Sequence, residues 1–238
     1  MDVEVIKAAT DLRGRSAVVD TEPVAAAVAR PLLRGVLHEI AFWFSLIAGV
    51  LLVASADSGE RRLTAVVFAA SVAVCFGASA LYHRVSWRPP VRLWMRRIDH
   101  AGVFLLIAGT YTPVTILALH GSWRPVVLAV VWIGAVTAIA VKFVWITAPR
   151  WLAAGFGLAL GWVAVVALPE LVRSLPSAAV ALIGVGGLAY TAGAIVYARG
   201  RPDPVPSVFG YHEVFHALTI VGVACQYTAI AFFVVPAR

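Results

Sequence analysis

Seven apolar stretches, each about as long as a membrane-spanning helix, restrict most strongly what this chain can fold into. A helix needs roughly 20 mostly apolar residues to cross the hydrocarbon core of a bilayer. The stretches cover residues 35–54, 63–83, 98–119, 125–146, 151–169, 177–198 and 211–235. Short connections rich in Arg, Pro and Gly separate them, of which "SWRPPVR" and "RGRPDPVPS" are the clearest predicted breaks. The chain is therefore predicted to be an all-α membrane protein, a bundle of seven transmembrane helices.

The composition supports lipid as the environment of these stretches. Hydrophobic residues make up 61% of the 238 residues and charged residues only 13%. A soluble domain has about 45–50% apolar and about 25% charged residues, so a soluble core cannot absorb this excess. The net charge of +7 is then a topology signal, and nucleic acid is not expected as a partner. Both cysteines, Cys75 and Cys225, fall inside apolar stretches, so no disulfide framework is expected.

Basic residues predict the orientation of the chain. If the connections alternate between the two sides of the membrane, one side carries 14 Lys and Arg residues and the other 5. The positive-inside rule then places the N-terminus in the cytoplasm and the C-terminus outside. Residues 1–33 are predicted to form a polar cytoplasmic arm, and residues 34–238 the seven-helix domain. The arm has no apolar core of a cleavable signal peptide. With 17 Arg against 2 Lys, the bias indicates a bacterial origin and hence a bacterial plasma membrane.

Ionisable residues inside membrane spans are costly, and in this chain several occur at one predicted depth. "SALYHR" ends the second stretch and places His83 near the inner face. "RRIDHAG" opens the third stretch there with Asp99, and "YHEVFHAL" opens the seventh with His212 and His216. Ser79 precedes His83 by one helical turn, so both share a face. Three segments that are distant in sequence are thus predicted to bring polar side chains to one level.

These side chains have the chemistry of a zinc site if the second, third and seventh helices are neighbours. Three imidazoles and a water form the open tetrahedral site of catalytic zinc, and the ion lowers the pKa of that water. Asp99 would then accept or orient its proton, and Ser79 would hydrogen-bond the water or a developing oxyanion. Each residue alone also has a structural explanation. Ser79 can bond back to its own helix, Asp99 can cap a helix, and His83 can be an interfacial histidine.

The sequence His212–His216 also matches the H-E-x-x-H motif of zinc proteases. A protease would need a third ligand downstream, yet no His, Asp or Glu follows His216. Glu213 is therefore expected to be a solvated acid at a helix N-terminus, with a role as a base left open. His38 is the alternative third ligand. His120 lies at the opposite predicted face, and His100 points away from Asp99 around the helix.

Together, "SALYHR", "RIDHAGVFLLIAGTYTPV" and "HEVFH" resemble the hemolysin III family, over about residues 34–235. That family is related to the progestin and adiponectin receptors and, more distantly, to the alkaline ceramidases. The resemblance implies a seven-helix bundle with its N-terminus inside. It also implies that His83, His212 and His216 are zinc ligands, and that Ser79 and Asp99 surround the zinc-bound water.

Two hypotheses for the function follow from these observations. The first is a membrane-embedded zinc hydrolase that acts on a lipid-like amide or ester, with the acyl chain entering between helices. The alternative is a non-enzymatic protein with structural zinc, either a receptor-like lipid sensor or a cytolytic factor as the family name suggests. A metal or proton transporter is a weaker hypothesis, because the outer halves of the apolar stretches carry almost no polar residues.

Overall fold

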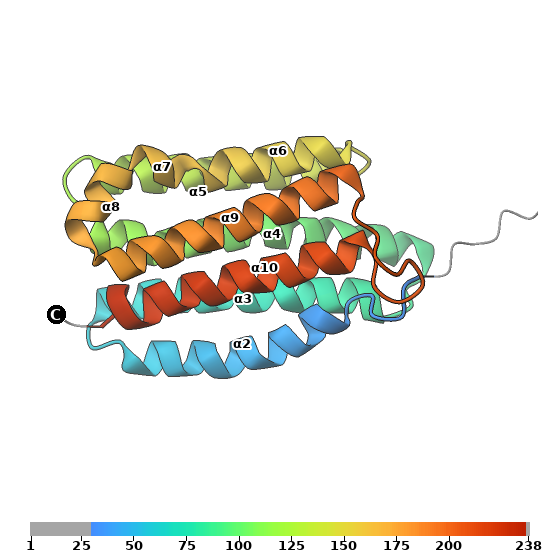
Figure 1. Ribbon diagram of the computed structural model, residues 1–238, viewed down its shortest axis with the longest axis horizontal. Coiled ribbons are helices and arrows are strands. Elements are labelled where there is room, and N and C mark those ends of the chain that lie inside the picture. Colours follow the sequence, from blue (N-terminus) through green and yellow to red (C-terminus); the bar gives the residue numbers. More distant parts are fainter. Residues whose placement is uncertain (1–29, 237–238) are drawn as a thin grey trace, which may run out of the picture. The chain divides into compact units, whose positions relative to one another are not determined.

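A computed structural model describes residues 30–236, and these residues fold almost entirely into helices. Six long helices are α2 (Val36–Ser55), α3 (Gly59–Arg84), α4 (Pro89–Ala118), α5 (Trp123–Val144), α9 (Ser177–Arg199) and α10 (Tyr211–Ala229), the last continued by a short π-helix (Ile230–Val234) (Figure 1). Each is long and apolar enough to cross a membrane. The prediction of an all-α fold is confirmed. The N-terminal arm falls largely outside the described residues, so its boundary and the orientation stay predictions.

The fifth predicted span is not one continuous helix. It consists of α6 (Arg150–Gly161), α7 (Val163–Val166) and α8 (Leu168–Ser174), with a bend of 55° before α8. Pro169 explains the bend, because its ring would collide with the carbonyl of Val165 in a continuous helix. The described residues therefore contain six spans, or seven if this bent pair crosses the membrane as one.

A tyrosine on α4 stabilises the break between α6 and α7. The Tyr111 hydroxyl donates a hydrogen bond to the carbonyl of Gly161 and accepts one from the amide of Ala164, each 2.7 Å long. Both backbone groups lie where a regular helix is interrupted and would otherwise lack a partner. The broken span is thus attached to α4 by a side chain as well as by packing.

Helix α4 begins nine residues earlier than its predicted start at residue 98. The break predicted at "SWRPPVR" is confirmed, since residues 85–88 are not helical, but it is short, and Pro89 and Pro90 already occupy the first turn of α4. Proline is well tolerated there, because the first amides of a helix have no partner within it and the fixed φ suits the helix. Asp99 consequently lies in the interior of α4 and is only 8% exposed. The alternative that Asp99 caps a helix N-terminus is wrong.

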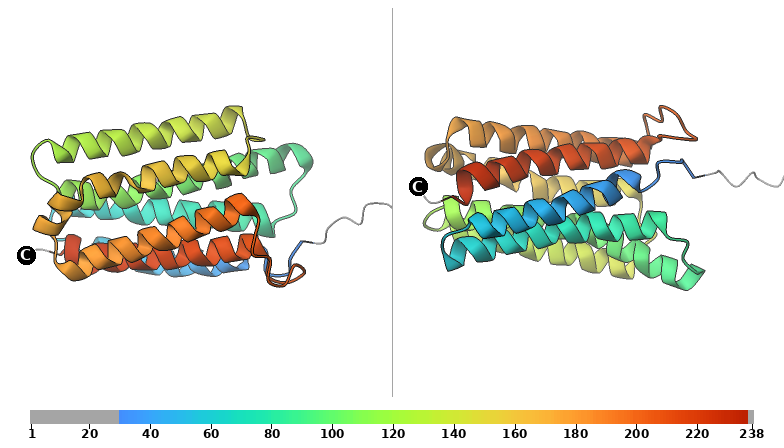
Figure 2. Two further views of the ribbon diagram at one scale, coloured as in Figure 1. Left: turned by 45° about the horizontal axis from the view of Figure 1, so that its top comes forward. Right: turned by 90° about the horizontal axis from the view of Figure 1, so that it is seen from below.

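The packing order of the helices brings distant segments together at one end. Helix α3 packs between α2 and α4, and α10 packs against both α9 and α2 (Figures 1 and 2). The end of α3 and the beginnings of α2, α4 and α10 lie at the same end of this helical unit (Figure 1). Close contacts use small residues: a Cβ on Gly102 of α4 would lie 3.1 Å from the Cα of Cys75 on α3. Large apolar side chains such as Trp43, Phe44 and Ile47 point outward, as expected in lipid.

Candidate metal centre

Three histidines from two helices meet at this end of the bundle. His83 lies in the last turn of α3, and His212 and His216 lie one turn apart at the start of α10. One ring nitrogen from each of the three lies within 4.8 Å of the other two. The Nε2 atoms of His83 and His212 are 3.1 Å apart. The structure thus brings together the three histidines proposed as ligands from the sequence.

The spacing of these nitrogens suits a tetrahedral zinc ion. Zinc–nitrogen bonds of 2.0–2.1 Å place two nitrogens about 3.4 Å apart in a tetrahedral site. The 3.1 Å separation of His83 and His212 is close to that value, and small side-chain rotations would bring the third ring into place. His216 is buried, and its Nδ1 makes no hydrogen bond to any described residue. Three neutral imidazoles therefore fit zinc and leave one position for water or substrate.

Asp99 and Ser79 lie beside the histidines, as the sequence predicted. An Asp99 carboxylate oxygen is 3.8 Å from Nε2 of His83, too far for a direct hydrogen bond but close enough to reach a molecule held between them. The Ser79 hydroxyl is buried and lies near the Asp99 carboxylate, yet it makes no well-aligned hydrogen bond to any described residue. Ser71, about two turns earlier on α3, does bond back to the carbonyl of Phe68 at 2.7 Å. The alternative that Ser79 does the same is wrong.

Glu213, the acid of the H-E-x-x-H sequence, is completely buried, with 0% exposure. One carboxylate oxygen accepts a hydrogen bond from Nε of Arg34 at 2.5 Å, and the other accepts one from the amide of Gly210 at 2.9 Å. The expectation of a solvated acid was wrong, because the segment before α2 folds over the start of α10. A carboxylate held on both oxygens in this way is a structural group. The signal in the sequence was its position three residues after the helix N-cap, where Glu bonds back to the cap.

The segment that covers the site, residues 31–35, is called the strap here. Its backbone amides at Leu32 and Leu33 donate hydrogen bonds to the carbonyls of Ser207 and Val208, at 3.0 and 3.1 Å. At its end, Gly35 adopts a left-handed conformation with φ of 81°. A Cβ on Gly35 would lie only 2.6 Å from the Cβ of His83. The strap therefore holds its backbone directly against one of the three histidines.

Replacing Gly35 by Ala is expected to displace His83. The left-handed conformation alone costs about 1–2 kcal/mol for a residue with a Cβ, and the new methyl group would also push the imidazole. We expect a lower melting temperature and weaker zinc binding, measured by thermal unfolding and by competition with a chelator. Gly121→Ala is the matched control, since Gly121 has a φ of 56° and open space around its Cα. Equal loss of zinc affinity in both variants would contradict the role of the strap.

The remaining histidines take different places. The ring of His38 stacks on the ring of His216, with centroids 3.7 Å apart and planes at 12°. It is buried but lies outside the group of three nitrogens, so the structure places this alternative ligand behind His216 rather than beside the others. His120 lies near Glu170 with an exposed ring, away from the group, as predicted. His100 is partly buried on α4.

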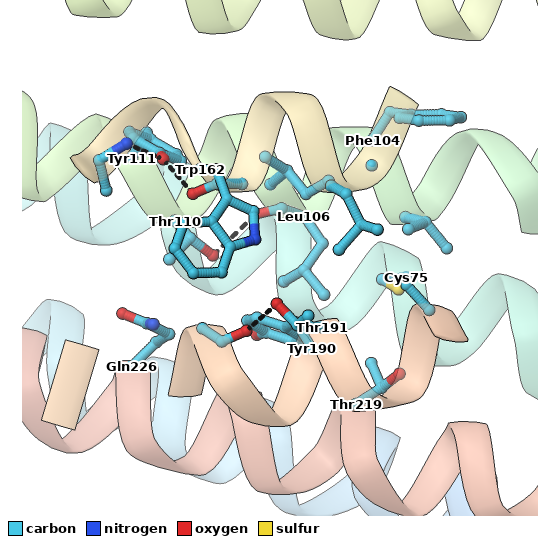
Figure 3. A pocket seen from close by; sticks show the side chains of 18 of the residues that line it. Cys75, Phe104, Leu106, Thr110, Tyr111, Trp162, Tyr190, Thr191, Thr219 and Gln226 are labelled. Carbon is cyan, nitrogen blue, oxygen red and sulfur yellow. Dashed lines mark hydrogen bonds between the residues drawn. The ribbon is translucent and has the colours of Figure 1, made fainter. Parts of the chain in front are cut away.

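An apolar cavity of about 390 Å³ extends from the histidines into the bundle. His38, Ser79, Asp99, His212 and His216 contribute to its wall at the polar end. Farther in, the wall consists mainly of apolar side chains, and Figure 3 shows Phe104, Leu106 and Trp162 among them. Such a cavity suits a hydrocarbon chain with a polar group at the histidine end. The sequence did not reveal this cavity, because its wall combines residues from several helices.

Comparison with known proteins identifies the family to which this chain belongs. The family model described as "Haemolysin-III related" matches residues 26–227. The "Hemolysin-3 homolog" of Bacillus subtilis is 27% identical over 207 residues, which cover 86% of this chain and 94% of that protein. "Hemolysin-3" of Bacillus cereus is 27% identical over 214 residues, covering 88% and 94%.

A plant protein is also similar to this chain. The "Heptahelical transmembrane protein ADIPOR2" of rice (Oryza sativa subsp. japonica) is 32% identical over 190 residues, which cover 72% of this chain and 82% of that protein. Both the hemolysin III resemblance and its relation to the adiponectin receptors are therefore confirmed. Together with the candidate spans, these similarities show that the chain is an integral membrane protein of the haemolysin-III-related family.

Proposed function

We propose that this protein binds a zinc ion through His83, His212 and His216 and hydrolyses an amide or ester bond of a lipid-like substrate. The observation that carries this proposal is the apolar cavity that begins at His212 and His216, two of the three clustered histidines. An acyl chain in the cavity would place its carbonyl group beside Asp99 and Ser79. By the charge distribution of the connections, the site would face the cytoplasm, in a bacterial plasma membrane.

The residues around the histidines support a hydrolytic role. When bound, a zinc ion supplies a Lewis acid and a water whose pKa is lowered to about 7. The Asp99 carboxylate, 3.8 Å from Nε2 of His83, would be placed to accept a proton from a water held beside the three histidines. The Ser79 hydroxyl is free of helix bonding and can donate a hydrogen bond to the carbonyl oxygen of the substrate as negative charge develops there. Both oxygens of Glu213 are occupied, so this acid takes no part.

Metal analysis of the detergent-purified full-length protein tests the metal site. We expect about one zinc per chain, as typical of a site with three nitrogen ligands. His83→Ala, His212→Ala and His216→Ala should each lose most of this zinc, because two imidazoles hold the ion much less tightly. His120→Ala is the control and should retain it, since this exposed histidine lies near Glu170. Full zinc content in all three variants would contradict the proposal.

Turnover is measured on the same preparations with a fluorescent ceramide and a fluorescent acyl ester. Release of the fatty acid should require zinc, stop after chelation and return when zinc is added back.

The alternative function, a receptor-like lipid sensor or cytolytic protein with structural zinc, is favoured by one observation. The strap and the stacked ring of His38 cover the histidines closely. Stoichiometric zinc without release of fatty acid from any acyl amide or ester would support that alternative.

A further inference from the structure

A buried lysine lies in the wall of the same cavity. Lys142 is on α5, two residues before the helix ends, and is only 3% exposed. The sequence placed it among the basic residues of a connection, but the structure turns it inward. No hydrogen bond or salt bridge joins its ammonium group to a residue of the described chain, 30–236. A lysine covered to this extent without an acidic partner among the described residues is costly, and in a membrane protein it indicates a function.

The charged neighbours of Lys142 are also basic. Arg96 on α4 lies close enough to repel the lysine charge, and His100, one turn farther along α4, interacts with both. The Nδ1 atom of His100 is buried and makes no hydrogen bond to any residue of the described range. Asp99 is the acid near Arg96, and it faces the metal centre instead. Lys142 and His100 thus both line the cavity, Arg96 adds positive charge nearby, and no acidic residue within 30–236 forms a salt bridge with Lys142.

This basic group adjoins the metal centre. His100 follows Asp99 directly, and both residues, with Lys142, contribute to the wall of the one cavity. Tyr197 of α9 lies between Lys142's basic neighbours and the metal centre. Its hydroxyl is close enough to Arg96 and Asp99 to feel their charges, and its ring lies 6.1 Å from that of His212. A ligand whose carbonyl lies at the histidines and whose chain lies in the cavity would therefore have the basic group beside its polar end.

We propose that Lys142 and His100, with the positive charge of Arg96 nearby on α4, bind the anionic group of an amphiphile, a carboxylate or phosphate joined to the acyl chain through the amide or ester bond. The preferred substrates would then be N-acyl amino acids or similar anionic acyl lipids, and neutral acyl amides would bind more weakly. Hydrolysis adds one water across the C–N bond, with hydroxyl going to the acyl carbon and hydrogen to the departing amine. The substrate assignment rests on the proposed hydrolase function, whereas the anion site does not.

Binding of two matched probes tests the site in the detergent-purified full-length protein. N-oleoylglycine and N-oleoylethanolamide share the acyl chain and the amide, but only the first carries a charge. We expect the protein to bind N-oleoylglycine about tenfold more tightly, as one charge-assisted hydrogen bond provides. Lys142→Met should remove this preference, and Lys142→Arg should keep it. Arg199→Gln, at an exposed residue ending α9, is the control and should also keep it.

The Lys142→Met variant is expected to fold, since replacing an unpaired buried charge by an apolar side chain is neutral or stabilising. Its melting temperature, measured alongside, should not fall. Equal binding of both probes by the unchanged protein, or a preference that survives in Lys142→Met, would overturn the anion site. If inorganic phosphate displaced the bound probe as effectively as unlabelled N-oleoylglycine does, the site would bind a free anion. That result would overturn the proposal that the ligand is an amphiphile. Preferential binding without hydrolysis would leave the anion site standing and refute the hydrolase function.

Discussion

Replacing Asp99 by Asn is expected to lower the turnover of the acyl substrate by about 10²–10⁴-fold, the range that a positioned general base contributes. Asn has nearly the same shape as Asp but cannot accept a full proton. Asp99 is buried on α4 with an oxygen 3.8 Å from Nε2 of His83. Among the described residues that line the cavity, it is the one carboxylate. The measurement is the rate of fatty acid release at saturating substrate.

Zinc content separates this effect from damage to the metal site. Asp99 is not one of the three nitrogen donors, so Asp99→Asn should retain about one zinc per chain. Asp57→Asn is the control for charge removal, because Asp57 is exposed and pairs with Arg61 on α3, away from the histidines. Full turnover in Asp99→Asn would remove Asp99 from the mechanism, and loss of zinc would make it a ligand or a support of one.

Replacing Arg34 by Met is expected to lower the free energy of unfolding by about 3 kcal/mol, the lower end of the range for a buried ion pair that loses one partner. The lower end applies because the Arg34 side chain is 21% exposed and Glu213 keeps its bond to the Gly210 amide. The loss comes mainly from the Glu213 carboxylate, which has 0% exposure and would lie unpaired in the protein. Thermal and denaturant unfolding of the purified protein measure it.

A second Arg–Glu pair at the same end of the bundle provides the control. Arg84 and Glu39 are 2.7 Å apart, but their side chains are 46% and 44% exposed. Arg84→Met should therefore cost at most about 1 kcal/mol, as exposed pairs do. The double variant Arg34→Met with Glu213→Met should recover much of the lost stability, because no unpaired charge remains. Equal losses in the two single variants would show that the Arg34 pair is not effectively buried.

Hydropathy and the helical period are local properties of the sequence, and they predicted much of the fold of this protein. The all-α fold and most helices follow from apolar stretches of about 20 residues. Short motifs within these stretches indicated the hemolysin III family, and the family model that matches residues 26–227 confirms it. The shared depth of His83, Asp99 and the His212–His216 pair followed from counting alternate spans. The structure places these side chains together, within reach of one ion or one water. Their roles in catalysis stay predictions.

Errors in the prediction arose where neighbours in space decide the outcome. Pro169 interrupts the fifth span, whereas Pro89 and Pro90 begin α4, because the effect of proline depends on its position in a helix. Glu213 was predicted to be solvated, but Arg34 of the strap forms an ion pair with it and its side chain is buried.

The residue order by itself determined the class of the protein, the apolar spans and the side chains available for a metal site, because each depends on residues a few positions apart. Tertiary structure alone decided that His38 stacks behind His216, that Lys142 faces an apolar cavity, and that this cavity begins at the histidines. The physical reason is that burial and charge pairing depend on which helices pack together. The sequence of one helix does not specify which distant helix becomes its neighbour.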